Sequence, residues 1–191
     1  MPETFVLENA TIFDGTGREP YRNGAVVVSD GLVQAVGPMS QVSTPRHAEV
    51  IDMAGKTVMP GLIDAHAHVG FVEQNFADDT ENRHPGATYA YSVARNIEDT
   101  LMYGFTTIRD AGGCDWSFKL AVERGMITGP RMFVSNSFIS QTGGHGDMRQ
   151  RHERTGPRRY HPLMPQPHVL AHSLQLFSIT ITHIHLHYYL S

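Results

Sequence analysis

This 191-residue sequence contains one cysteine and two lysines, and it has no net positive charge. The single cysteine, Cys114, excludes an intramolecular disulfide framework and a cysteine-rich zinc module. A formal net charge of −4 supplies no basic field, so we expect neither a nucleic acid nor a membrane as a partner. The first residues lack a positive segment followed by an apolar run, so we expect no secretory signal and a cytoplasmic location.

The composition changes near residue 150. Overall, 40% hydrophobic residues and 18 glycines are typical of a globular protein. Residues 151–191, in contrast, contain no lysine, no aspartate and only one glycine, together with seven of the 12 histidines. We therefore interpret residues 151–191 as an atypical His- and Pro-rich tail, foreign to the preceding sequence and produced by a frameshift, a retained intron or early termination.

The first 58 residues carry the pattern of a small β domain. Strand-like stretches alternate there with turn residues, at 4–13, 24–29, 32–37, 49–52 and 57–59. Asp30-Gly31 separates two of these stretches and suits a type I′ turn, whose twist matches that of paired strands. We therefore predict a β-rich, sandwich-like antiparallel domain over residues 1–58.

From residue 59 onward, strand patterns alternate with helix patterns. Strands are predicted at 61–68, 105–110 and 132–138, and helices at 85–103 and 117–124. Spacings of three and four residues predict which apolar side chains the first helix buries: Ala87, Tyr91, Ala94, Ile97 and Leu101. This alternation is typical of βα units around a parallel sheet, and it stops near residue 150.

The strongest chemical signal is the sequence His66-Ala67-His68 in the first of these strands. Successive side chains of a strand alternate faces, so the two histidines share a face with Cα atoms about 7 Å apart. Two neutral imidazoles at that spacing can converge on one metal ion. Such a pair is also often just one polar face of a strand, and the spacing alone leaves both interpretations open.

Four stretches of the sequence resemble the metal-dependent amidohydrolase superfamily. They are Met59–His68, similar to its opening barrel strand, Thr106–Gly113, similar to its second strand and loop, Gly129–Arg131, similar to the approach to its third strand, and Thr142–Asp147. The last stretch is most similar to the branch that holds imidazolonepropionase-like proteins and Xaa-Pro-type dipeptidases. The resemblance covers residues 4–150.

The resemblance implies an α/β fold, a (β/α)8 TIM-type barrel with its active site at the carboxyl ends of the strands. It implies that His66 and His68 hold the more buried of one or two divalent metal ions. Zinc is the first choice, although imidazole also suits iron, nickel and copper. The implied activity is metal-dependent hydrolysis of a carbon–nitrogen bond in a small-molecule amide, a dipeptide-like substrate or a cyclic amide.

Two residues that the resemblance implies are missing from the sequence. Active family members use a lysine on the fourth barrel strand as a bridging group and an aspartate on the eighth as the general base. Here the only lysines are Lys56 and Lys119, and the last aspartate is Asp147. A barrel of this type needs about 250 residues, so residues 59–191 supply only about three of its eight strands.

We therefore expect a small antiparallel β domain followed by a truncated barrel over residues 59–150, without hydrolase activity by itself. This first interpretation treats the chain as part of a metal-dependent hydrolase of carbon–nitrogen bonds. The alternative is a catalytically incompetent fragment or a binding protein that retains half of a metal site. In either case the open edge of a three-stranded parallel sheet favours self-association.

Four further residues are candidates for the site. His145, in a glycine-rich loop, is a candidate for substrate contact, although loop histidines are often simply solvated. Asp64 shares the face of His66 and either supports the metal ligands from behind or caps the strand. Arg109 and Asp110 end the second strand and also stand behind the ligands, where we favour a structural salt bridge between loops over contact with substrate.

Overall fold

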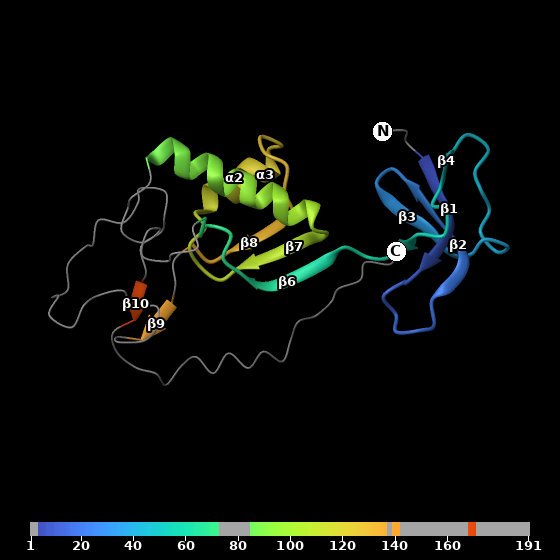
Figure 1. The fold of residues 1–191 in the computed structure, drawn as a ribbon, viewed down its shortest axis with the longest axis horizontal. Coiled ribbons are helices and arrows are strands. Elements are labelled where there is room, and N and C mark those ends of the chain that lie inside the picture. Colours follow the sequence, from blue (N-terminus) through green and yellow to red (C-terminus); the bar gives the residue numbers. More distant parts are fainter. Residues whose placement is uncertain (1–3, 73–84, 137–138, 142–167, 171–191) are drawn as a thin grey trace, which may run out of the picture. The chain divides into compact units, whose positions relative to one another are not determined.

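The computed structural model describes residues 4–72, 85–136, 139–141 and 168–170 (Figure 1). The chain divides into two compact units, of which the first ends at Leu62 and the second begins at Ile63. No helix within these described ranges is long and apolar enough to cross a bilayer.

Unit 1 is built around one sheet. Its strands are β1 (Thr4–Ile12), β2 (Tyr21–Ser29), β3 (Leu32–Pro38), β4 (Glu49–Asp52) and β5 (Thr57–Val58). The order across the sheet is β3-β2-β1-β4, and β5 also pairs with β1. These bounds follow the predicted strand-like stretches closely, so the strand pattern of residues 4–59 is confirmed.

The β2–β3 hairpin confirms the turn predicted from Asp30-Gly31. Both residues have positive φ, 52° for Asp30 and 76° for Gly31, as a type I′ turn requires. Glycine adopts this region freely and aspartate tolerates it. The dipeptide therefore favours the register that pairs Ser29 with Leu32.

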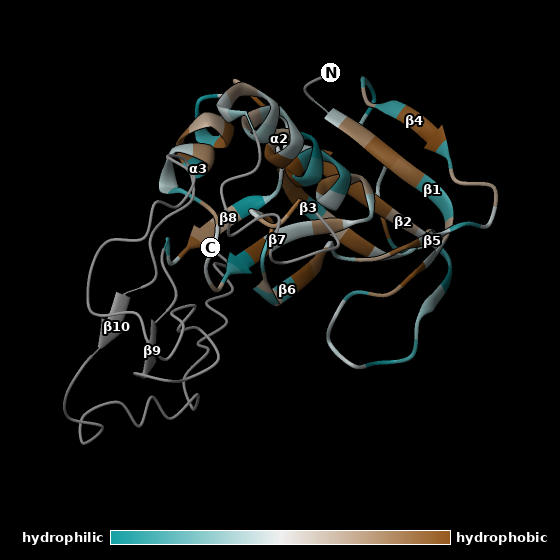
Figure 2. Ribbon diagram, turned by 60° about the vertical axis from the view of Figure 1, so that its left-hand side comes forward, coloured by the Kyte–Doolittle hydropathy of each residue, from teal (hydrophilic) through white to brown (hydrophobic). Residues whose placement is uncertain are grey.

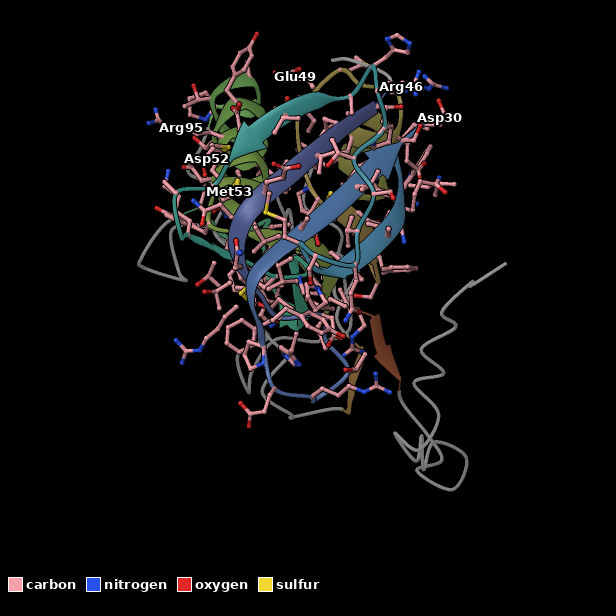
Figure 3. All side chains as sticks on the ribbon, turned by 90° about the vertical axis from the view of Figure 1, so that its right-hand side faces the viewer. Asp30, Arg46, Glu49, Asp52, Met53 and Arg95 are labelled. Carbon is pink, nitrogen blue, oxygen red and sulfur yellow. The ribbon has the colours of Figure 1, made fainter. Side chains whose placement is uncertain are left out.

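The sheet of unit 1 is mixed, which corrects the expectation of a fully antiparallel domain. β4 and β5 both run parallel to β1, along its first and second parts. The chain crosses from β3 at one edge of the sheet to the far side of β1, so β4 enters in the direction of β1. Figure 3 marks the two ends of β4 with Glu49 and Asp52. Strand direction is not encoded in alternating hydrophobicity, so the sequence pattern could not reveal it.

Apolar side chains cover both faces of this sheet. Two buried clusters are formed, one by Val6, Ala25 and Val27 and the other by Ala10, Ile12 and Val26. The neighbouring residues Val26 and Val27 point to opposite faces of β2, so the clusters lie on opposite sides of the sheet. β1 contributes to both because its register shifts near Asn9, which has a positive φ of 56°. Figure 2 shows the resulting long hydrophobic segments along β1.

Unit 2 alternates strands and helices, as predicted. β6 (Leu62–Ala67), β7 (Phe105–Asp110) and β8 (Arg131–Val134) form a sheet in that order, and β7 and β8 are parallel. Helices α2 (Gly86–Met102) and α3 (Trp116–Glu123) lie on one side of this sheet (Figure 1). A second parallel pair is formed by β9 (Ile139–Gln141) and β10 (His168–Leu170).

The third predicted strand of unit 2 is shorter than expected. Residues 132–138 are predicted to be extended, but β8 ends at Val134, and residues 137–138 lie outside the described residues. The other two strands and both helices agree with their predicted ranges to within about two residues, which is the usual uncertainty of element ends.

The buried face of α2 differs from the predicted one. Ile97 is fully buried as predicted, but its buried neighbours are Tyr89 and Val93, whereas Tyr91 of the predicted face is 78% exposed. Apolar residues occur on more than one face of this helix at three- and four-residue spacings, so only packing on the sheet selects the buried one. The selected residues pack with Ile108 of β7.

Candidate functional site

Two histidines lie together at the carboxyl end of β6. The ring centroids of His66 and His68 are 5.1 Å apart, and the ring planes meet at 79°. Two imidazoles bound to one tetrahedral ion through nitrogens about 2 Å from it would have centroids about 5 Å apart. The observed spacing therefore suits two ligands of a single ion.

A backbone contact orients the ring of His68. Its Nδ1 lies 2.9 Å from the carbonyl oxygen of Gly112, in the loop after β7. A carbonyl oxygen only accepts, so Nδ1 carries the proton, and the lone pair of the neutral ring is on Nε2. Metal-binding histidines are commonly held in this way, with the second ring nitrogen donating to a carbonyl or a carboxylate.

Asp64 and Arg109 bind the two sides of one peptide group. Oδ1 of Asp64 accepts a hydrogen bond from the backbone N–H of His66 at 2.9 Å. Nε of Arg109 donates to the carbonyl oxygen of Ala65, in the same peptide group, at 2.6 Å. Both side chains therefore fix the backbone of β6 immediately before the His66 side chain. The sequence favours a salt bridge between loops for Arg109, whereas the contact in the structure is with a strand carbonyl.

Asp110 is fully buried at the end of β7. Its Oδ2 accepts from the N–H of Val69 at 2.9 Å, and its Oδ1 accepts from those of Gly112 and Cys114 at 2.9 and 3.3 Å. Burial raises the pKa of the Asp110 carboxyl, because the charged form loses its hydration. The three N–H donors, and the His68 ring whenever it is protonated, oppose this rise without cancelling it.

The thiol of Cys114 lies beside this carboxylate. Cys114 is the only cysteine of the sequence and is fully buried. Burial raises the pKa of the thiol strongly, and the negative charges of Asp110 and Asp115 raise it further. A thiol that resists ionisation is a poor nucleophile and a poor metal ligand.

Backbone hydrogen bonds join the carboxyl ends of the three strands. The N–H of Ala111 donates to the carbonyl of Ala67 at 2.9 Å and connects the loop after β7 with β6. The N–H of Gly113 donates to the carbonyl of Asn136 at 3.0 Å and connects the same loop with the segment after β8. The backbone that carries the histidine pair is therefore bonded to the loop after β7, and this loop is bonded in turn to the segment after β8.

Three residues that the sequence analysis did not single out complete this arrangement. Tyr89 Oη donates to the carbonyl of Gly70 at 2.6 Å, and Asn96 Nδ2 donates to that of Val69 at 2.9 Å. A Cβ atom on Gly70 would lie 1.9 Å from the carbonyl oxygen of Gly113, so only glycine permits this approach of the two loops. An asparagine beside buried apolar positions of α2 could have indicated Asn96, whereas no local pattern indicates Gly70.

Some predicted site residues are not brought together. The described ranges contain no group of three or more His, Cys, Asp or Glu side chains that could hold a metal ion. His145 lies outside the described residues. Two open hollows of about 610 and about 270 Å³ are lined largely by residues of α2, and neither is lined by His66 or His68. The histidine pair is therefore the only predicted ligand set that the described structure assembles.

Comparison with known proteins identifies a family. A model described as "Amidohydrolase family" matches residues 57–171. The match extends into the tail that we separated from the family at residue 150. Ochratoxinase from Aspergillus niger is 35% identical over 148 residues, which are 75% of this chain and 30% of that protein. Imidazolonepropionase from Pseudomonas savastanoi pv. phaseolicola is 40% identical over 72 residues, 38% of this chain and 18% of that protein.

Solved structures agree with these matches. A crystal structure of a prolidase complexed with N-methylphosphonate-L-proline has a TM-score of 0.69 at 38% identity, covering 81% of this chain and 37% of that one. The chain spans 30% or less of the two curated relatives. The expected resemblance of the N-terminal portion to imidazolonepropionase-like and dipeptidase-like proteins is thus confirmed. With a family match over more than half of its residues, the chain belongs to the amidohydrolase family.

Proposed function

We propose that unit 2 is the first part of a (β/α)8 barrel and carries half of its metal site, with His66 and His68 as ligands of a divalent ion. The observation that supports this most directly is the bond from Nδ1 of His68 to the carbonyl of Gly112, which leaves the lone pair on Nε2. Zinc is the first choice, because neutral imidazoles are among its preferred ligands. The donors present fit such an ion in chemistry and spacing.

The side chains around the pair would keep His66 in place. Asp64 holds the N–H of the Ala65–His66 peptide group and Arg109 holds its carbonyl, so this group cannot rotate without breaking one of the bonds. A fixed backbone reduces the freedom that a histidine loses when it binds an ion. We assign supporting roles to both side chains on this ground.

The proposed reaction is hydrolysis of a carbon–nitrogen bond in a small-molecule amide, a dipeptide-like substrate or a cyclic amide. The names of the relatives support this class, since prolidase, imidazolonepropionase and ochratoxinase are among them. When bound, a divalent ion would polarise the carbonyl and make water more acidic. We also retain His145 as a candidate for substrate contact, which its place in the sequence suggests.

A second reading treats the chain as a binding protein with a half-built site and no turnover. The described residues supply only two ligands, and the sequence has no lysine after Lys119 and no aspartate after Asp147. We therefore propose that the 191-residue chain does not hydrolyse amides by itself. Turnover by the purified chain that depends on added Zn²⁺ would contradict this part of the proposal.

Metal titration tests the ligand assignment. The apo chain is titrated with Zn²⁺ in a His183→Ala, His185→Ala, His187→Ala background, so that these histidines of the tail do not contribute. We expect one equivalent to bind, and we expect His66→Ala and His68→Ala each to weaken binding roughly tenfold or more, because each removes a ligand.

The matched control for this titration is His47→Ala, which changes an exposed histidine of unit 1. It should leave the affinity for Zn²⁺ unchanged. If the His66→Ala and His68→Ala variants bind as tightly as their parent, neither residue is a ligand and the proposal fails.

One side of the sheet in unit 2 carries neither of the described helices, which supports the expectation of self-association. Phe133 is 56% exposed and alternates along β8 with the buried Met132. We expect Phe133→Ser to lower the association measured by sedimentation. Met126→Ser changes a methionine that is 73% exposed outside the strands and should have less effect. Equal effects of both variants would argue against the sheet as the contact.

A further inference from the structure

Two paths of hydrogen bonds connect Asp110 with His68, although Asp110 is the last residue of β7 and His68 directly follows β6. One carboxylate oxygen holds the N–H of Val69, the residue that follows His68. The other holds the N–H of Gly112, whose carbonyl receives the Nδ1 proton of His68. The same buried carboxylate therefore fixes both the backbone next to His68 and the group that orients its ring.

The position of Gly112 is the important element of this chain of bonds. Gly112 is buried and has a φ of 140°, a backbone conformation that residues with a side chain rarely adopt. Such a residue needs bonds to keep its peptide groups aimed in one direction. Among the described contacts, the N–H of Gly112 is held by Asp110 and its carbonyl faces His68.

We propose that Asp110 is a positioning residue that selects the Nδ1–H tautomer of His68 and so presents Nε2 to the metal ion. This inference rests on the proposed function for the identity of the ion's ligand, but the tautomer itself is a property of the metal-free chain. A neutral histidine in water favours the Nε2–H form slightly or populates both, so a fixed acceptor is required to reverse the preference. Asp110 supplies that acceptor indirectly, by holding Gly112.

The competing explanation is that Asp110 only braces the loop after β6. That loop has other anchors, since Tyr89 donates to the carbonyl of Gly70 and Asn96 to that of Val69. Tyr89→Phe removes one of these anchors without touching Gly112. It is therefore a matched control: it loosens the same loop, but it leaves the route from Asp110 to His68 intact.

The test uses the full 191-residue chain labelled with ¹⁵N-histidine and free of metal. Ring nitrogen signals are recorded at about pH 8, above the ordinary histidine pKa of about 6.5. The signals of His68 are assigned by their loss in His68→Gln. We expect the Nδ1–H form in the wild type and in Tyr89→Phe, and a shift toward the Nε2–H form in Asp110→Asn. We also expect Asp110→Asn to weaken Zn²⁺ binding about 10–100-fold, and Tyr89→Phe to weaken it less.

The outcomes separate this inference from the proposed function. An Nε2–H form of His68 in the wild type, or an Nδ1–H form that persists in folded Asp110→Asn, would overturn the inference. Loss of Zn²⁺ binding in the wild type with the expected tautomers would instead count against the proposed function. If Asp110→Asn does not fold, amide hydrogen exchange of the wild type is read together with the tautomer of His68: slow exchange at Gly112 with the Nδ1–H form supports the inference, and unprotected exchange at Gly112 refutes it.

Discussion

The two units use carboxylates in opposite ways. In unit 1, Asp52 is exposed, and its Oδ1 accepts from the N–H of Ala54 at 2.8 Å and from Asn9 Nδ2 at 2.9 Å. These bonds lower the pKa of Asp52. In unit 2, Asp110 accepts similar backbone bonds, but burial raises its pKa. Unit 1 thus exposes the Asp52 carboxylate at the end of β4, whereas unit 2 buries the Asp110 carboxylate beneath the candidate site, where three backbone N–H groups hold it.

The largest expected effect comes from Gly70→Ala in unit 2. The added Cβ would meet the Gly113 carbonyl at 1.9 Å, and both partners are backbone in cross-bonded loops. We expect the free energy of unfolding to fall by about 3 kcal/mol, because the loops after β6 and β7 cannot separate without losing their bonds. Urea unfolding followed by fluorescence measures this, since Trp116, in unit 2, is the only tryptophan.

The control for this change is Gly37→Ala in unit 1. A Cβ on Gly37 would meet only Val42 Cγ2, at an ordinary contact distance of 3.8 Å. Gly37→Ala should leave the Trp116 transition in place. A Gly70→Ala variant as stable as the wild type would show that the two loops are not locked together as described.

An intermediate effect is expected from Gly24→Ala in unit 1. Here the added Cβ would lie 2.5 Å from Cδ1 of Ile12, the end of a side chain, and 3.1 Å from the Gly37 carbonyl. A side chain can adjust more easily than backbone, so we expect a loss of about 1–2 kcal/mol. Amide hydrogen exchange in β1 and β2 measures it. A loss equal to that of Gly70→Ala would remove the distinction between the two units.

The smallest expected effect is an opposite response to acid. Asp52 has a lowered pKa in the folded chain, so its contribution to stability is present above the ordinary value of 3.8 and is lost as the pH falls below it. Asp110 has a raised pKa, so the folded chain keeps its proton to higher pH than the unfolded chain does. Its contribution to stability therefore falls as the pH rises from about 4 through its folded pKa.

Paired variants isolate these two contributions. Unfolding is measured between about pH 3 and pH 7, where aspartates titrate, by Trp116 fluorescence for unit 2 and by hydrogen exchange for unit 1. Asp52→Asn should flatten the acid loss of unit 1, and Asp110→Asn should flatten the opposite slope of unit 2. Slopes of the same sign in both units, unchanged by the variants, would contradict the assigned pKa directions.

Much of the fold could be predicted because its signals are local. Asp30-Gly31 requires only its own backbone conformation, and the β2–β3 hairpin follows from it. The shared face of His66 and His68 follows from the alternation of a strand. In both cases the information lies within a few consecutive residues, and the structure has only to preserve it.

The rest could not be predicted because it depends on contacts between distant segments. The sequence suggests a salt bridge for Arg109 and Asp110, but Arg109 donates to Ala65 and Asp110 binds Val69, each more than 40 residues away. The buried face of α2 is chosen by the sheet, which places Tyr89 and not Tyr91 inside. These arrangements exist only after the strands have come together.

The burial of Cys114 provides a way to measure how often the bonded loops after β6 and β7 open. We call these loops the junction beneath the histidines. The thiol of Cys114 is fully buried, and its backbone N–H is bonded to Asp110, so a thiol reagent can reach it only when the junction opens. Since the sequence has no other cysteine, all modification occurs at Cys114, and its rate reports on these openings. The rate at which the Cys114 thiol is modified therefore measures how often the loops that support the candidate site open.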